Sequence, residues 1–517
     1  MSEYHEKNNA LFKSITALDG ALFINGEFRK GAGGRLPVEN PATGKVIGHL
    51  AAATPEEIEE AVAAARRAFP AWAAERPKAR ANALHRLGDL IAGDALNMAR
   101  NMTIEQGKPV NEAQGEILKL AEICHFYGEE ATRVQGDVVP NDPPGFQSLV
   151  VREPVGVVGA ITPWNYPAEL VGWKLCASLA AGCTLIIKPA ELTPYTALAI
   201  AEKCLEAGIP AGVVNVLTGK GEQVGQALVE HPQVDKIAFT GSSAVGLHIQ
   251  QSCPQVKRLS LELGGNGPMV VTACADVAAA VKGAVRRSFR NCGQVCIAIN
   301  RIYVHRSCYR AFVSKMGVAT NGLRLGNGLD DPAADLGAMA SVEPLNKTRA
   351  HLEDALAKGA RLVAGGKAPE GVEYAKGHFF RPTVLADCTH QMRVMTEETF
   401  GPLVGLAPFD DIDEVISRAN DTPYGLAAYV YARDLAAIHR LSAALDYGNV
   451  AINNVDASMM NAPMGGVSKV VWATSMAVRG CWSISISSTS ACTTVSGTKP
   501  CRRFWALISA PRGVRRC

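Results

Sequence analysis

The sequence predicts an α/β fold built around parallel β-sheets, and three observations support this. Short apolar runs rich in β-branched residues alternate with helical segments from residue 151 onward. A second region of the same alternating kind extends from about residue 259 to 460. Residues 132–151 lie before the first alternating region and fit neither a helix nor the wound sheet. The chain has 517 residues, enough for two or three domains with large cores.

The N-terminal part is predicted to be helical. Residues 54–69 carry apolar side chains at the spacing of one helix face. Thr54 followed by Glu57 forms a capping-box pattern, and Pro55 suits the first helical position. Residues 111–131 continue in the same helical style.

Four apolar runs are predicted to be buried strands of a parallel sheet, because each is short and rich in branched side chains. They are residues 155–161, 184–188, 213–217 and 236–240. The helices predicted between them are residues 167–180, 195–207 and 222–230. In such a sheet, ligands bind beyond the carboxyl ends of the strands.

The segment before this sheet, residues 132–151, has two extended pieces around a Pro-Pro-Gly turn. Such a pattern is typical of a hairpin. We therefore expect a β-hairpin arm that stands apart from the wound sheet.

The composition excludes several function classes. Hydrophobic residues make up 48% and charged residues 20% of the chain, and the net charge of +3 gives no reason to expect a nucleic-acid partner. No signal peptide is visible, and no apolar run approaches the length of a membrane span. The 14 cysteines are scattered singly, which favours reduced thiols and a cytoplasmic location.

Cys296 is the candidate nucleophile. A single cysteine is usually a small buried apolar residue, but Gly293 and Gln294 precede this one and suit a tight turn that presents a thiol. Cys292 is the obvious competitor. The two cysteines could also form a metal or redox pair, yet no further Cys or His cluster lies near them in sequence, so we expect no metal.

Two further residues have the chemistry of an acyl-transfer site. Glu262 lies in an apolar run that ends in two glycines, where it could be an ion-paired acid or a desolvated general base. Asn165 follows the first predicted strand, where its amide could satisfy a turn or donate to a developing oxyanion.

Two glycine-containing turns could hold phosphate groups. One includes Gly221, and the other includes Ser242 and opens a helix directly after a strand. Lys188 and Glu191 end the second strand, where a lysine and an acid could hold ribose hydroxyls or form a solvated charge pair. Each of these signals is weak by itself.

Taken together, the motifs resemble the NAD(P)-dependent aldehyde dehydrogenase superfamily, and especially its succinate-semialdehyde dehydrogenase-like members. The motifs are GQVC, LELGG, PWNYP, KPAE, FTGSSAVG and EETFGP. Six motifs in the family's order and spacing make the resemblance specific, and it covers residues 20–466.

The resemblance implies a Rossmann-like cofactor domain, an α/β catalytic domain and a β-hairpin oligomerisation arm. The implied division is residues 1–131 with 152–258 for cofactor binding, 259–466 for catalysis, 132–151 for the arm, and 467–517 as an atypical tail. It also implies a homodimer or homotetramer that uses NAD, with NADP possible, to oxidise a small aldehyde.

The resemblance assigns roles residue by residue. Cys296 is the implied nucleophile, Glu262 the general base, and Asn165 the oxyanion donor together with the backbone N–H of Cys296. The implied cofactor-binding residues are Lys188, Glu191, Ser242, Gly221, Trp164, Glu398 and Phe400.

The substrate indications conflict. Arg290 matches an arginine that resembles the carboxylate anchor of succinate-semialdehyde dehydrogenases, and a guanidinium suits that role. Trp173 stands where the second anchoring arginine would fall, and it resembles the tunnel wall of broad-specificity and betaine-aldehyde-type relatives. A small semialdehyde is the first expectation. An acylating dehydrogenase, a thiol hydrolase and an inactive relative are alternatives that the retained residues disfavour.

The last segment is unlike the rest of the chain. Residues 467–517 contain no Asp or Glu, but eight Lys or Arg and four Cys. They could be a basic disordered tail. We instead interpret them as a reading-frame shift near codon 467, which would remove the final strand implied by the resemblance. The expected result is poor assembly and weak activity.

Overall fold

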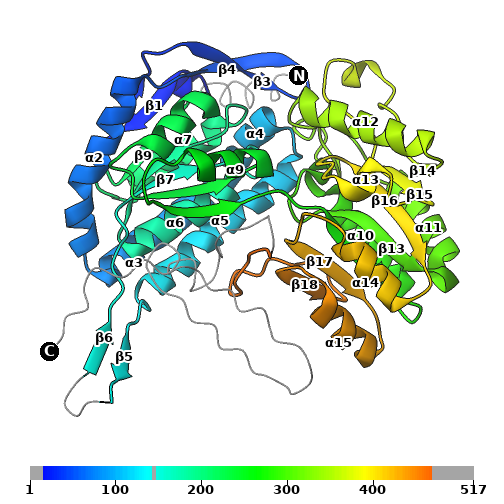
Figure 1. The fold of residues 1–517 in the computed structure, drawn as a ribbon. Helices are drawn as coiled ribbons and strands as arrows, with labels where there is room; N and C mark the ends of the chain where they lie inside the picture. The colour runs from blue at the N-terminus through cyan, green and yellow to red at the C-terminus, as the bar shows by residue number, and fades with distance from the viewer. Residues whose placement is uncertain (1–14, 143–146, 468–517) are drawn as a thin grey trace.

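The computed structural model describes residues 15–142 and 147–467, which form two lobes, each built on a seven-stranded sheet (Figure 1). In the first sheet, β10, β7, β8 and β9 run parallel, β11 extends the parallel part, and β1 and β2 add an antiparallel edge. Its strands in spatial order are β11 (Arg258–Glu262), β10 (Lys236–Thr240), β7 (Val157–Ile161), β8 (Thr184–Lys188), β9 (Val214–Val216), β1 (Ala21–Ile24) and β2 (Glu27–Lys30).

The second sheet is also parallel except for one edge, where β14 pairs antiparallel with β15. Its strands in spatial order are β14 (Arg361–Ala364), β15 (Thr383–Ala386), β16 (Leu403–Phe409), β13 (Ile299–His305), β12 (Gly267–Val271), β17 (Ala427–Tyr431) and β18 (Asn449–Ile452). Strands β12 and β17 are buried along their whole length, as central strands covered on both faces should be.

Helices cover the first sheet on both faces. Helices α2 (Pro55–Ala74) and α8 (Gln226–Glu230) lie on one side, and α6 (Glu169–Ala181) and α7 (Pro194–Glu206) lie on the other. An outer layer of α3 (Pro77–Gly93), α4 (Ala95–Gln106) and α5 (Val110–Ala131) packs on α6 and α7. The remaining elements of this lobe are the π-helical turn η1 (Gly221–Gly225) and α9 (Ser243–Ser252).

Helix α2 begins as the sequence predicts. The Thr54 hydroxyl accepts the backbone N–H of Glu57, and the Glu57 carboxylate accepts that of Thr54, so the capping box is complete. Pro55 occupies the first turn, and the buried residues repeat along one face of the helix.

In the second lobe, α10 and α11 pack against the sheet, and α14 and α15 contact each other beside it. The helices of this lobe are α10 (Val277–Phe289), α11 (Arg306–Asn321), α12 (Val342–Ala357), α13 (Arg393–Thr396), α14 (Ile412–Asn420) and α15 (Leu435–Ala444), with short 3₁₀ turns η2 (Arg290–Gly293) and η3 (Val372–Tyr374). None of the helices within residues 15–142 and 147–467 is long and apolar enough to cross a membrane.

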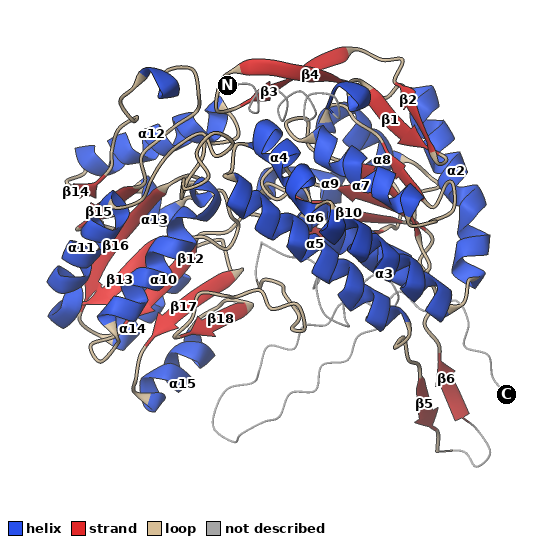
Figure 2. Ribbon diagram, turned by 180° about the vertical axis from the view of Figure 1, so that it is seen from behind, coloured by secondary structure: helices blue, strands red, loops and turns tan. Residues whose placement is uncertain are grey.

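Two small antiparallel pairs complete the fold. Strands β3 (Arg35–Asn40) and β4 (Lys45–Ala51) lie across the first lobe, and β5 (Asp137–Pro140) with β6 (Gln147–Val150) forms the predicted hairpin. The hairpin projects away from both lobes (Figure 2). Val138, Val139 and Leu149 are exposed on it, and no third strand within the described ranges pairs with either of its edges.

The positions of the predicted strands are confirmed, with one correction to the expected division of the chain. Residues 259–262 were assigned to the second half, but they form most of β11, which pairs with β10 in the first sheet. The boundary at residue 259 is therefore wrong for this strand. The chain crosses to the second sheet through residues 263–266, between β11 and β12. This crossing brings the carboxyl ends of the first sheet against the amino ends of the second.

Candidate active site

Four strand ends of the first sheet lie next to one another. The register pairs Thr240 with Glu262, Phe239 with Ile161, and Ile161 with Lys188, so β11, β10, β7 and β8 end at the same edge. The loop that carries Asn165 follows β7 at this edge. Strand register therefore brings the predicted general base and the ribose-binding lysine to the edge from which the Asn165 loop starts.

The predicted nucleophile lies in a strained turn between α10 and β13. Asn291 and Cys292 have φ of 48° and 54°, and Gly293 has φ of 70°, so three successive residues lie in the left-handed region. A Cβ on Gly293 would lie 2.2 Å from the carbonyl oxygen of Gly401, so only glycine fits there. The turn carries the chain sharply away from α10 and ends at Cys296, three residues before β13.

The two cysteines of this turn differ in accessibility. Cys292 is only 3% exposed, and its Sγ donates to the carbonyl oxygen of Gly337 at 3.2 Å. Cys296 is half-buried. A reagent from solvent therefore reaches Cys296 in preference to Cys292.

Two glycines allow the crossing segment to touch this turn. A Cβ on Gly265 would lie 2.0 Å from the carbonyl oxygen of Cys296, and one on Gly264 would lie 2.6 Å from the Glu398 carboxylate. A side chain at Gly265 would therefore displace the backbone of the cysteine turn, and one at Gly264 would displace the Glu398 carboxylate. The LELGG motif thus has a direct packing reason to end in two glycines.

Asn165 is held beside the same turn. Its Nδ2 donates to the carbonyl oxygen of Gln294 at 2.9 Å, and the side chain is only 4% exposed. An amide nitrogen carries two hydrogens, so one donor remains for a further acceptor. This is the property that an oxyanion site requires.

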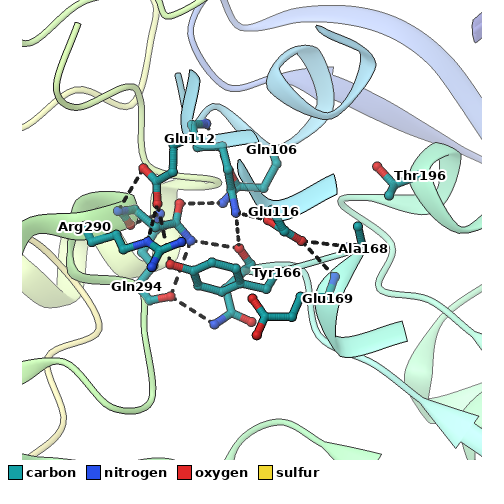
Figure 3. A network of polar contacts seen from close by, with 12 residues as sticks. Gln106, Glu112, Glu116, Tyr166, Ala168, Glu169, Thr196, Arg290 and Gln294 are labelled. Atoms are coloured by element: carbon teal, nitrogen blue, oxygen red, sulfur yellow. Dashed lines mark hydrogen bonds and ion pairs between the residues drawn. The ribbon is translucent and has the colours of Figure 1, made fainter. Parts of the chain in front are cut away.

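A buried polar network fixes the Asn165 loop (Figure 3). Lys108 and Glu116 form an ion pair with both side chains fully buried, and Lys108 Nζ also donates to the carbonyl oxygen of Asn165 at 2.8 Å. Glu116 accepts the backbone N–H of Ala168 at 2.8 Å. Asn291 Nδ2 donates to the same Asn165 carbonyl at 2.8 Å, which joins the loop to the cysteine turn.

Glu262 lies in a poorly solvated site. Burial raises the pKa of its carboxyl group, while Lys174 and a hydrogen bond with Thr240 act in the opposite direction. Lys174 on α6 donates to the Thr240 hydroxyl at 2.5 Å, and burial lowers its own pKa. A carboxyl group with a raised pKa suits proton transfer near neutral pH.

The Cys296 thiol is protonated at neutral pH in this environment. Burial is the main cause that raises its pKa to about 12, and the negative charges of Glu262 and Glu398 add to the effect. Because the thiolate is the reactive form, a base must accept the thiol proton as the sulfur attacks. Among the neighbouring acids, Glu262 has the largest charge effect on the thiol, and it is the candidate for that base.

The predicted adenosine-ribose residues also converge. Lys188 Nζ donates to Glu191 Oε1 at 2.7 Å, and the backbone N–H of Gly221 donates to the same oxygen at 2.5 Å. Lys188 is 2% exposed, and burial lowers its pKa. The Glu191 carboxylate is therefore oriented from two sides at the edge of the sheet, as a ribose-binding acid would need to be.

The other predicted cofactor residues lie around the same edge. Ser242 caps α9, where its hydroxyl accepts the backbone N–H of Val245 at 3.3 Å. Glu398 Oε1 accepts the backbone N–H of Gly265 at 2.7 Å. Phe400, with φ of 56°, packs edge-on against Trp164 with ring centroids 5.4 Å apart.

The two predicted substrate residues occupy different settings. Trp173 is 6% exposed and donates through Nε1 to Glu169 at 3.3 Å. Arg290 is exposed, its Nε lies 3.4 Å from Glu112 Oε1, and its guanidinium carbon lies 5.7 Å from the ring centre of Tyr166. Arg290 and Glu112 line a cavity of about 450 Å³ together with Arg286 and Arg287.

Sequence reasoning missed the residues that support the site from a distance. Lys108, Glu116, Lys174 and Asn291 all contact the predicted site residues or their neighbours. Lys174 and Glu116 lie within helical segments, where charged residues normally face solvent. The sequence signal for such a residue is a charged side chain on an otherwise apolar helix face. This signal indicates that the side chain is buried with a partner, but it does not identify the partner residue.

The model of the aldehyde dehydrogenase family matches residues 28–477. The chain belongs to the aldehyde dehydrogenase family. This match ends ten residues beyond codon 467, the position near which we expect the frame shift. The residues that the shift would change, 468–517, lie outside the described part of the chain.

Three relatives illustrate the similarity of this aldehyde dehydrogenase to characterised proteins. A glutarate-semialdehyde dehydrogenase from Pseudomonas aeruginosa is 44% identical, over 89% of this chain and 94% of that protein. An NADP(+) succinate-semialdehyde dehydrogenase from Escherichia coli is 44% identical, over 86% and 92%. The crystal structure of a betaine aldehyde dehydrogenase from Staphylococcus aureus in complex with NAD+ is 33% identical, with a TM-score of 0.88 over 92% and 96%.

The effect of the Glu262 charge on the pKa of the Cys296 thiol can be tested without measuring enzyme turnover. Glu262→Gln removes a negative charge that raises the thiol pKa, so the pH profile of Cys296 alkylation by iodoacetamide should move to lower pH. The reacted site is identified by peptide mass analysis. Glu222→Gln, a change at an exposed acid of η1, is the matched control and should leave the profile unchanged. An unchanged profile in Glu262→Gln would show that this carboxylate does not act on the thiol.

Proposed function

We propose that this aldehyde dehydrogenase oxidises a small semialdehyde to the corresponding carboxylate through a covalent intermediate on Cys296. The single observation that supports this most strongly is the position of Cys296. It is the accessible thiol next to a strained turn, the Asn165 amide binds the carbonyl of Gln294 in the same turn, and the charge of Glu262 acts on the thiol.

In the proposed first half-reaction, Cys296 Sγ forms a bond to the aldehyde carbon while Glu262 accepts the thiol proton. The carbonyl oxygen becomes an oxyanion that accepts hydrogen bonds from Asn165 Nδ2 and from the backbone N–H of Cys296. The buried network that fixes the Asn165 loop keeps this donor in place before substrate arrives. A thioester on Cys296 remains once the hydride has left.

The residues around the carboxyl edge of the first sheet fit a nicotinamide dinucleotide. Lys188 and Glu191 would hold the adenosine ribose, Gly221 and Ser242 the pyrophosphate region, and Glu398 the nicotinamide ribose, with Trp164 and Phe400 beside it. When bound, the nicotinamide ring supplies the acceptor for the hydride.

Before the proposed second half-reaction, Glu262 releases the thiol proton to solvent. Glu262 then removes a proton from water, and the resulting hydroxide attacks the thioester carbon. As the C–S bond breaks, Glu262 returns this proton to Cys296 Sγ, and the carboxylic acid product loses its own proton to solvent. The raised pKa of Glu262 makes it a stronger base than an exposed glutamate, and the rate should rise with pH as this group loses its proton.

The test of this function is the loss of turnover in Cys296→Ser, measured as NADH formation with succinate and glutarate semialdehydes. NAD+ binding should survive, because the cofactor residues are untouched. Cys292→Ser is the matched control and should retain most of the activity, since that thiol is buried against Gly337. Turnover in Cys296→Ser close to that of the unaltered protein would contradict the proposal.

Glu262→Gln separates the two half-reactions in the same assay. The amplitude of the NADH burst should remain stoichiometric, because solvent can replace Glu262 as acceptor of the thiol proton in a single slower turnover, while steady-state turnover should fall by about 10²–10⁴-fold. An unaffected steady state would make Glu262 a structural residue. Addition of coenzyme A distinguishes hydrolysis from acyl transfer, because an acylating enzyme would need it for turnover.

Arg290 supports an acidic substrate. Its ion pair with Glu112 uses Nε, which leaves the terminal guanidinium nitrogens for a carboxylate. Two of the relatives are named for semialdehydes, glutarate and succinate semialdehyde, which carry a carboxylate. Trp173 remains the competing indication, because it would suit an uncharged or betaine-type aldehyde.

Arg290→Leu decides between these substrates. Loss of a charged hydrogen bond of about 1.5–3 kcal/mol should lower kcat/KM for succinate semialdehyde by about tenfold to a hundredfold. The same change should have little effect on an uncharged aldehyde of similar length. Arg286→Leu, which alters another arginine of the same cavity, is the control. Equal losses for both aldehydes would make Arg290 part of the scaffold.

The proposed cofactor preference is NAD over NADP. The Glu191 carboxylate can accept both ribose hydroxyls but repels a 2′-phosphate, although Lys188 beside it moderates the repulsion. Glu191→Gln should therefore reduce the ratio of kcat/KM for NAD to that for NADP, with Glu222→Gln as the control. A preference of the unaltered protein for NADP would refute this assignment.

The hairpin of β5 and β6 is proposed to bridge subunits. Its apolar side chains Val138, Val139 and Leu149 are exposed, and its edges lack a partner strand within the described residues. If residues 468–517 do not supply the expected strand, the chain should elute from size-exclusion chromatography as aggregate or monomer. A stable, active dimer or tetramer would contradict the frame-shift interpretation.

A further inference from the structure

Helices α3 and α5 carry the same short pattern at the place where they touch. Residues 85–89 have the sequence HRLGD, and residues 125–129 have the sequence HFYGE. In each, a histidine is followed by a glycine three residues later and an acid four residues later, so all three share a helix face. Ala81 of α3 lies against Gly128, and Ala121 of α5 lies against Gly88, so the helices run antiparallel and the two patterns face each other.

The glycines make room for the opposite histidines. A Cβ on Gly88 would lie 2.8 Å from Nε2 of His125, and one on Gly128 would lie 3.0 Å from Nε2 of His85. The two imidazole rings stack with centroids 5.3 Å apart and an interplanar angle of 28°. Their Nδ1 atoms face each other at 3.0 Å.

The acids occupy the outer edges of the same rings. His85 Nε2 lies 3.3 Å from Glu129 Oε1, and His125 Nε2 lies 3.4 Å from Asp89 Oδ1. Glu129 uses its other oxygen to bind Arg133 at 3.1 Å. A carboxylate at Nε2 favours a proton on that nitrogen. In two neutral rings, this leaves a lone pair on each Nδ1, and the two lone pairs point at one another.

Two facing lone pairs 3.0 Å apart repel each other. This repulsion is relieved either by a change of tautomer, in which one ring gives up its Nε2–H and donates from Nδ1 to the other, or by a cation between the two nitrogens. The cation keeps both Nε2–H contacts, and it can be a shared proton or a metal ion. A histidine that binds a metal through one nitrogen commonly donates its other N–H to a carboxylate, and both histidines here have that arrangement. A tetrahedral zinc ion holds two imidazole nitrogens about 3.3 Å apart, so the two nitrogens need to separate slightly and the rings need to turn until their lone pairs converge on the ion.

We propose that His85 and His125 bind one divalent transition-metal ion of the zinc, nickel or copper class through their Nδ1 atoms. The described residues contain no cluster of three or more His, Cys, Asp and Glu side chains that could hold a metal, so water completes the coordination. The side chains of His85 and His125 are 32% and 41% exposed, which leaves room for those waters. The ion would link α3 to α5 and stabilise the layer that packs on α6.

The site is separate from the catalytic residues. His125 lies near the end of α5, whereas Glu112 and Glu116, which support the Asn165 loop, lie near its beginning. Metal binding should therefore raise the melting temperature without being required for turnover.

The experiment titrates Ni²⁺ into the metal-free full-length chain at mildly alkaline pH, after its thiols have been blocked with iodoacetamide. Heat of binding and melting temperature are followed together. In the unaltered chain we expect saturable Ni²⁺ binding and a metal-dependent rise in melting temperature. In His85→Asn and in His125→Asn, one of the binding sites and this rise should both be lost. Asp89→Asn keeps both ligands and should weaken this site by about 10–100-fold.

His231→Asn is the matched control. His231 also places Nε2 against a carboxylate, 2.9 Å from Glu59, but its Nδ1 accepts the backbone N–H of Gln233 at 3.1 Å. This variant should bind Ni²⁺ as the unaltered chain does. Metal-free melting curves show whether each variant folds, and His85→Gln replaces His85→Asn if that variant does not.

Two outcomes would overturn the proposal. Equal Ni²⁺ binding in the unaltered chain, His85→Asn and His125→Asn would place the metal elsewhere. The absence of any Ni²⁺ or Zn²⁺ effect on the melting temperature of the unaltered chain would mean that a hydrogen bond or a shared proton joins the two rings instead.

Discussion

The ion pair between Lys108 and Glu116 is the interaction on which the arrangement of the active site depends. Both side chains are fully buried, and between them they bind the Asn165 carbonyl and the backbone N–H groups of Ala168 and Glu169. Lys108 also lies 3.9 Å from the ring centre of Tyr166. Removing one member of such a buried pair leaves an uncompensated charge and costs about 3–5 kcal/mol. The network therefore makes the conformation of the loop after β7 nearly obligatory.

The loop after β7 contacts the second lobe at a strained turn. Residues 291–293 have positive φ, which costs free energy at Asn291 and Cys292 because both carry a Cβ. The Asn291 side chain offsets part of that cost, since it binds the Asn165 carbonyl and accepts a hydrogen bond from Gln106 at 3.1 Å. The strain is thus maintained by contacts with the first lobe, and the same contacts fix the position of Cys296 relative to Asn165.

Electrostatics explains why this thiol and its neighbouring acids are poised for proton transfer. Burial raises the pKa of Glu262, Glu398 and Glu169, so each acid disfavours its charged form. Lys174 is the positive group that opposes this effect at Glu262. Burial also raises the pKa of Cys296, so the thiol and the Glu262 carboxyl group both favour their protonated forms more than exposed groups would. Attack by the sulfur therefore needs the ionised form of Glu262 as the proton acceptor.

Much of this protein could be predicted from local sequence patterns. The strands around residues 157–161, 184–188 and 236–240 follow from short branched apolar runs, and the start of α2 follows from Thr54 and its capping partner. The six motifs of the family resemblance identified the residues that the strand register then brought to one edge. These features are encoded within a few residues of the chain, because periodicity and turn chemistry are local properties.

Only the tertiary structure decided which distant residues meet. It placed β11 in the first sheet, paired Lys108 with Glu116 beneath the Asn165 loop, and set Lys174 against Thr240 near Glu262. It also brought the Nδ1 atoms of His85 and His125 to a distance of 3.0 Å across two antiparallel helices. A charged residue in a helical pattern shows that it needs a partner, but the partner depends on how the helices and sheets pack. That packing is fixed by the burial of the whole core and is not encoded in any one segment of the sequence.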